Sequence, residues 1–77
     1  MASLELGDSR LSEFLKKKNI TQAEFARRIG VKRQFIYQVI HKERRFSLEQ
    51  GILASYILEC DVSDLYYHTY IPDNRSE

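Results

Sequence analysis

Apolar residues recur every three or four positions in four stretches of the chain, with polar and charged residues between them. This spacing places the apolar side chains of each stretch along one face of an α-helix, and we expect that face to point inward. The four sets are Leu11, Phe14 and Leu15; Phe25, Ala26 and Ile29; Phe35, Ile36, Val39 and Ile40; and Leu48, Ile52, Leu53, Tyr56 and Ile57.

Capping signals fix where two of these helices begin and where one of them ends. Thr21 and Glu24 have the spacing of a capping box, which predicts that a helix begins just after Thr21. Gly30 follows the last apolar residue of that helix, where a left-handed residue would end it and turn the chain. Ser47 and Gln50 form a second capping box and predict the start of the fourth helix.

The ends of the chain carry weaker signals. Asp8 or Ser9 can cap the first helix, and residues 1–8 are expected to form a flexible arm. The segment 61–63 interrupts the fourth helix, and a short fifth helix is expected over 63–67. Gly51 indicates a close helix contact or a local weakness, and Cys60 is interpreted as a small core residue. The predicted fold is therefore all-α, a compact bundle of five helices.

Charge is segregated along the chain, although the net charge is only +1. The segment 16–45 holds ten basic and two acidic residues, a balance of +8. The remainder holds two basic and nine acidic residues, a balance of −7. A basic segment of this kind favours contact with nucleic acid, which the whole-chain charge alone would not suggest.

Several function classes are disfavoured by what the sequence lacks. A single cysteine, Cys60, excludes an internal disulfide and a cysteine-rich zinc site, and His41 has no second ligand at metal spacing. No nucleophile–base pair, paired carboxylates or phosphate-cradling glycine loop is present, so we expect no enzyme, no cofactor and no metal. No signal peptide or membrane-length apolar run is found, and a cytoplasmic setting is expected.

One motif is specific. The pattern Gln22-x-x-x-Ala26-x-x-x-Gly30-Val31, followed by Ile36-x-Gln38-Val39, resembles the helix-turn-helix of the phage repressor and Cro family. The pattern has a physical basis, because a small residue is needed where the two helices cross and a glycine at the turn between them. The resemblance implies a lambda-repressor-like DNA-binding domain over residues 9–71, followed by a frayed tail over 72–77.

The resemblance also implies which residues contact DNA. The helix that begins near Lys32 would enter the major groove, where arginine can bind guanine and glutamine can bind adenine through paired hydrogen bonds. The expected base-contacting residues are Lys32, Arg33, Gln34, Tyr37 and Gln38. The expected phosphate-contacting residues are Gln22, Lys18, His41, Lys42, Arg44 and Arg45.

Alternatives remain for several of these assignments: Gln22 also fits a polar first-turn residue, and the base-contacting candidates also fit an ordinary solvated helix face. The lysine run 16–18 fits a solvated helix end as well as phosphate contact, because cations are favoured at a helix C-terminus. Lys42 stands where relatives carry a glycine, so the backbone of that loop is expected to differ.

The aromatic C-terminal segment is expected to form a dimer interface, although packing within one chain fits it nearly as well. The residues expected there are Leu65, Tyr66, Tyr67, Tyr70 and Ile71. The sequence thus predicts a sequence-specific regulator of transcription that binds double-stranded DNA, most simply a repressor, as a homodimer at least on DNA. The alternatives are a protein-binding adaptor or antitoxin module with a regulatory protein partner, and DNA binding without sequence preference.

Overall fold

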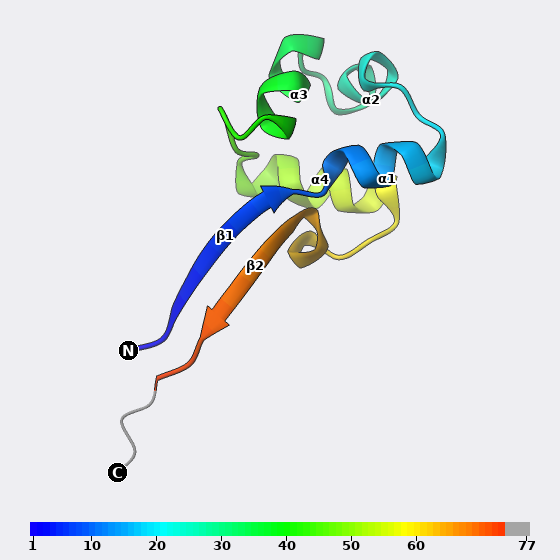
Figure 1. Cartoon of the computed structure of the whole chain (residues 1–77). Helices are drawn as coiled ribbons and strands as arrows, with labels where there is room; N and C mark the ends of the chain where they lie inside the picture. Colours follow the sequence, from blue (N-terminus) through cyan, green and yellow to red (C-terminus); the bar gives the residue numbers. More distant parts are fainter. Residues whose placement is uncertain (74–77) are drawn as a thin grey trace.

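The computed structural model describes residues 1–73, which form four α-helices, one 3-10 helix and two β-strands (Figure 1). The helices pack together, and the first and last elements of the described chain are two strands that pair with each other. In order, the elements are β1 (Ser3–Ser9), α1 (Leu11–Lys18), α2 (Gln22–Ile29), α3 (Arg33–Ile40), α4 (Leu48–Leu58), η1 (Val62–Leu65) and β2 (Tyr66–Ile71).

The helix ends follow the capping signals. The Glu24 N–H donates to the Thr21 hydroxyl oxygen at 3.0 Å, and α2 ends at Gly30, whose φ of 78° is left-handed. At α4 both halves of the capping box form: the Gln50 N–H donates to the Ser47 hydroxyl at 3.1 Å, and the Ser47 N–H donates to the Gln50 side-chain oxygen at 2.9 Å. The predicted starts of α2 and α4 and the predicted turn at Gly30 are therefore confirmed.

One apolar core lies between the helices and η1. Each of the first three helices contributes the residues that its apolar spacing predicted, while Phe14, Phe35 and Ile40 are partly buried against this core. Cys60 is also only partly buried, and burial raises the pKa of its thiol. The buried core consists of Leu11, Leu15, Phe25, Ala26, Ile29, Ile36, Val39, Ala54, Leu58 and Leu65.

The predicted inward face of α4 is wrong except for Ile57, which is partly buried against the core. Leu48, Ile52 and Tyr56 remain 74, 41 and 78 % exposed, and Leu53 is exposed as well. The opposite face packs inward because its small residues let α4 approach its neighbours closely. Since α4 has apolar residues on both faces, spacing alone could not identify the buried one. The residues buried along α4 are Gly51, Ala54, Ser55 and Leu58.

The all-α, five-helix expectation is also wrong. β1 and β2 pair antiparallel, with Leu4 opposite Tyr70 and Leu6 opposite His68, and β1 has a bulge between Leu6 and Ser9. Residues 1–8, expected to form a flexible arm, thus provide most of a strand. The expected fifth helix is a single 3-10 turn that ends at Leu65, after which the chain is extended.

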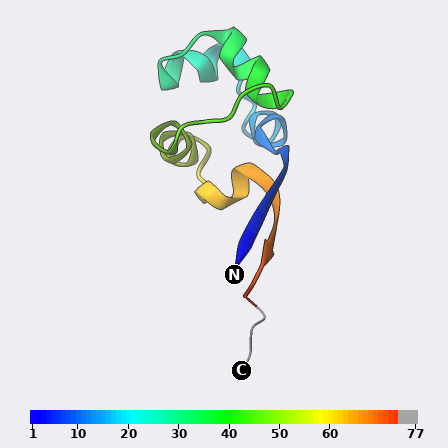
Figure 2. The ribbon, with the colours of Figure 1, turned by 90° about the vertical axis from the view of Figure 1, so that its left-hand side faces the viewer.

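The sheet projects away from the helices, as both views show (Figures 1 and 2). Because cross-strand partners share a face, Leu4, Leu6, His68 and Tyr70 lie on one side of the sheet. The expected fraying of residues 72–77 concerns mainly 74–77, which lie outside the described residues.

Candidate nucleic-acid interface

The turn between α2 and α3 positions the second helix of the motif. The Val31 N–H donates to the Ala26 carbonyl at 3.0 Å, and Ala26 itself is 2 % exposed. Ile36 and Val39 are completely buried and anchor the inner face of α3. These contacts leave the opposite face of α3 directed outward.

Two shallow hollows flank that outer face of α3, and they are lined by the residues expected to contact bases. Gln34 lines both hollows. The first is lined by Gln22, Arg33, Gln34 and Tyr37. The second is lined by Val31, Lys32, Gln34, Phe35, Gln38 and Arg44. The two hollows therefore bring the five expected base-contacting residues together with two of the expected phosphate-contacting residues.

A contact between two aromatic rings extends this surface to the residue that follows α3. The rings of Tyr37 and His41 lie 4.1 Å apart between centroids, tilted by 45°. Both side chains are exposed, so the pair presents a hydroxyl group and an imidazole to the surroundings. Its position joins the base-contacting candidates to the loop that follows α3.

That loop is folded back onto α3. The N–H groups of Glu43 and Arg44 both donate to the Gln38 carbonyl, at 2.8 and 3.2 Å. Lys42 adopts a φ of 67°, the left-handed conformation that glycine favours, so the lysine accepts a strained backbone at this position. The Arg44 guanidinium lies over the Phe35 ring, 5.8 Å from its centroid.

Two of the expected phosphate-contacting lysines have acidic partners. Lys42 Nζ lies 3.2 Å from the Asp8 carboxylate, which reaches it from β1. Lys18 pairs with Glu59 just after α4. In Figure 1 the C-terminal ends of α1 and α4 lie at the right, away from α3 at the upper left. The ion pair between Lys18 and Glu59 thus joins the C-terminal ends of α1 and α4.

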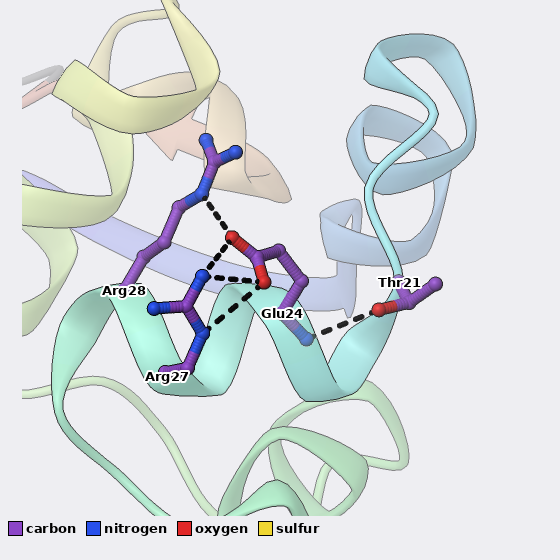
Figure 3. A network of polar contacts seen from close by, with 4 residues as sticks. All are labelled: Thr21, Glu24, Arg27 and Arg28. Atoms are coloured by element: carbon purple, nitrogen blue, oxygen red, sulfur yellow. Dashed lines mark hydrogen bonds and ion pairs between the residues drawn. The ribbon is translucent and has the colours of Figure 1, made fainter.

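A carboxylate–arginine cluster on α2 was not predicted. Arg27 donates to both carboxylate oxygens of Glu24 at 2.7 Å, and Arg28 donates to one of them at 2.9 Å (Figure 3). The Arg27 guanidinium, followed by that of Arg28, lowers the pKa of the Glu24 carboxyl. The Glu24 side chain therefore does not complete the expected capping box. The signal was present, because glutamate precedes the arginines by three and four residues.

The sequence matches a protein-family model described as helix-turn-helix over residues 11–65, and no curated protein matches it significantly. The chain belongs to the Cro/C1-type helix-turn-helix family. It is accordingly a DNA-binding regulator of transcription. The matched segment includes α1 to η1 and leaves both strands outside.

In this family member, the five residues expected at a dimer interface do not share one surface. Leu65 is 2 % exposed and belongs to the protomer's own core, so it offers no surface for a partner. The Tyr66 hydroxyl oxygen accepts a 3.4 Å hydrogen bond from the Phe46 N–H. Tyr67 and Ile71 lie on the opposite face of β2 from Tyr70, because alternate residues of a strand share a face.

The residues that sequence reasoning missed at this end are Leu4 and Leu6. They share the face of Tyr70 and are 54 and 39 % exposed. The alternation of Leu4-Glu5-Leu6 is a short strand signal that could have identified these two residues.

Among residues 1–73, no helix is long and apolar enough to cross a membrane, and no cluster of His, Cys, Asp and Glu could hold a metal ion.

Proposed function

We propose that this regulator binds double-stranded DNA in a sequence-specific manner, most simply as a repressor, and reads the major groove with α3. The observation that carries the proposal is the pair of hollows along α3, where the base-contacting candidates lie beside Gln22 and Arg44. The anchored inner face of α3 supports it, since a rigid helix presents its outer side chains in a fixed arrangement.

Within this surface, Arg33, Gln34 and Gln38 discriminate between bases. Arginine fits the two acceptors of guanine and glutamine fits the acceptor and donor of adenine, which distinguishes these bases in the major groove. Lys32 and Tyr37 add contacts at the edge of the groove, where a tyrosine ring can touch a thymine methyl group.

The loop after α3 contacts the sugar–phosphate backbone through Lys42, Arg44 and Arg45. Gln22 and His41 make further phosphate contacts at the two ends of the same surface. Lys42 must exchange Asp8 for a phosphate, and this exchange is feasible because an exposed ion pair contributes little stability. Lys18 is omitted from this set because it pairs with Glu59 at the C-terminal ends of α1 and α4.

On DNA the regulator is a homodimer that pairs through the sheet. A single recognition helix covers few base pairs, and two-fold pairing doubles the length of the site read. The face with Leu4, Leu6 and Tyr70 supports this arrangement, because an isolated two-stranded sheet with an exposed apolar face is marginally stable. The paired residues of that face, Leu4, Leu6, His68 and Tyr70, include no acidic side chain, so two copies of this set can meet without repulsion between carboxylates.

The first experiment selects bound sites from random DNA duplexes and then measures alanine variants on the selected site. Alanine at Arg33, Gln34 or Gln38 should flatten the preference at one or two base pairs, with about 1–3 kcal/mol of discrimination lost per paired contact. Alanine at Lys42, Arg44 or Arg45 should instead weaken all duplexes alike and lower the slope of log K against log salt by about 0.9. Unchanged base preference in all three α3 variants would contradict the role of α3.

A second experiment tests the dimer on the selected site. Two protomers should bind a palindrome whose half-sites are centred about 34 Å apart. Tyr70→Asp and Leu4→Asp should each weaken binding to the palindrome while leaving the weak binding to a single half-site unchanged. One protomer per palindrome, or variants that bind it as tightly as the parent, would rule out pairing through the sheet.

A further inference from the structure

The exposed face of α4 is apolar although the DNA-binding surface does not use it. Leu48, Ile52 and Tyr56 are spaced by four residues, so they form one stripe along the helix. The opposite face of α4 already packs into the core. A helix that is apolar on both faces is normally buried on both, so the stripe calls for a second covering layer.

The stripe leads into a hollow of about 730 Å³ between the C-terminal half of α4 and η1. We call it the α4–η1 hollow. Three apolar side chains and three carboxylates line it. Its lining residues are Ile52, Ser55, Tyr56, Glu59, Cys60, Asp61, Val62 and Asp64.

The carboxylates give the hollow a negative charge. Glu59 is paired with Lys18, but within the described part of the chain neither Asp61 nor Asp64 forms an ion pair. One oxygen of Asp64 accepts a 3.2 Å hydrogen bond from the Asp61 N–H, which leaves the other oxygen for a further donor.

We propose that the α4–η1 hollow docks a basic amphipathic segment of another protein. An apolar side chain of the segment covers Ile52, Tyr56 and Val62, and flanking lysines or arginines reach Asp61 and Asp64. Long basic side chains suit this surface, because their stems cover apolar atoms while their charged ends meet carboxylates. α4 and η1 lie at the opposite end of the helical part from α2 and α3 in both views, so the partner leaves α3 free (Figures 1 and 2).

Charge argues against a second copy of this chain as the occupant. A two-fold contact brings the same patch of both copies together, so Asp61 and Asp64 would meet their own equivalents. Like charges brought together at an interface are unfavourable, whereas a basic segment turns the same carboxylates into attractive contacts.

The probe is a fluorescently labelled synthetic helix of leucine and lysine, with its leucines along one face. Its binding to the full 77-residue chain is measured by anisotropy without DNA, so the result does not depend on the proposed DNA site. Two comparison peptides separate the contributions: one has the same composition in scrambled order, and one has glutamate in place of every lysine. The amphipathic basic peptide should bind at least tenfold more tightly than either.

Ile52→Asp and Tyr56→Asp test the location of the site. Each should weaken binding of the basic peptide at least tenfold, although each adds a negative charge that would strengthen a purely electrostatic attraction. Leu53→Asp is the matched control, since Leu53 is 43 % exposed, like Ile52 at 41 %, but lies about 100° around the helix from it. That variant should bind like the parent, and Asp61→Asn should weaken binding two- to threefold. Circular dichroism confirms that each variant is folded.

Three results would overturn the proposal. The scrambled or the glutamate peptide could bind as tightly as the basic amphipathic one, or both hollow variants could retain the parent affinity. Sedimentation could also reveal a dimer of the parent chain that Ile52→Asp abolishes, which would make a second copy the occupant.

Discussion

The helix-turn-helix buries its main anchors completely, whereas the terminal sheet leaves most of its large side chains exposed. Phe25, Ile36 and Val39 have no exposed surface, while Leu4 and Tyr70 are 54 and 63 % exposed. The first region is therefore stabilised by core packing within one chain. The second is held to the helices by a few polar and ring contacts.

Those contacts lie at the base of the sheet. The Tyr67 hydroxyl donates to the Glu13 carboxylate at 2.7 Å, and the Arg10 guanidinium lies 5.1 Å from the centroids of both the Phe14 and Tyr67 rings. The backbone N–H of Arg10 also donates to the Leu65 carbonyl at 2.8 Å. The difference teaches that the anchors of α3 are held by core packing, whereas the sheet is attached through contacts at its base.

The largest expected effect is on the free energy of unfolding, and it is tested by replacing one residue from each region. Ile36→Ala removes a buried anchor of α3 and should lower the free energy of unfolding by about 2–5 kcal/mol. Leu4→Ala, on the exposed face of the sheet, should change it by no more than about 0.5 kcal/mol. Urea unfolding at low protein concentration measures both. Similar losses in the two variants would mean that the sheet contributes to the core as much as α3 does.

The next largest effect concerns two glycines, whose replacement by alanine should change the free energy of unfolding in opposite directions. Gly30→Ala should destabilise the chain by roughly 1–2 kcal/mol, because alanine is strained at a φ of 78° although the space around Gly30 is open. Gly51→Ala should stabilise it by about 0.5–1 kcal/mol, because glycine weakens a helix interior. An added Cβ there would meet Val62 and Leu65 at ordinary contact distances of 3.7 and 3.8 Å. Thermal unfolding of both variants shows whether each is more or less stable than the parent. If Gly51→Ala were destabilised, the added Cβ would be crowded by the η1 side chains Val62 and Leu65.

The same contrast explains what the sequence could predict. The capping of α2 and α4, the turn at Gly30 and the buried anchors of α3 all follow from residues within one or two helical turns of each other. The sheet instead joins residues more than sixty positions apart, such as Leu4 and Tyr70. Local spacing carries no information on such a pairing, and residues 1–8 were therefore expected to form a flexible arm.

Two further misses have different causes. The buried face of α4 could not be chosen by periodicity, because Gly51 and Ala54 pack closely while Ile52 and Tyr56 remain outside. The face of α3 with its base-contacting candidates was predictable, whereas the ion pairs of Lys18 and Lys42 join distant segments. Which cations are already paired is thus a tertiary property.

A smaller effect concerns the attachment of the sheet. Tyr67→Phe removes the hydroxyl that donates to Glu13, and we expect a loss of stability below that of Gly30→Ala because the contact is exposed. The bond to Glu13 raises the pKa of Tyr67 above its ordinary value of 10.0. The protonated hydroxyl is therefore favoured in the folded state, so its contribution is present below pH 10 and declines as the pH rises through the raised pKa. Unfolding curves of parent and variant should converge at high pH, and a constant difference would exclude this bond as the cause.

The smallest effect concerns the carboxylate–arginine cluster of the helix-turn-helix. Glu24→Gln removes the charge that Arg27 and Arg28 contact, and these arginines lower the pKa of Glu24 below its ordinary value of 4.5. A lowered pKa means that the folded state favours the ionised carboxylate. Its contribution is then complete above pH 4.5 and is lost as the pH falls through the lowered pKa.

The parent should therefore be slightly more stable than Glu24→Gln near neutral pH, and the difference should vanish in acid. Unfolding by urea between pH 2 and pH 7 measures this difference. Glu49→Gln is the matched control, because Glu49 also lies in the first turn of its helix and forms no ion pair within residues 1–73. It reports the interaction of a carboxylate with the helix N-terminus alone. If both variants lose stability equally at every pH, the two arginines contribute nothing, and Arg27 and Arg28 are then as available to phosphate as any exposed cation.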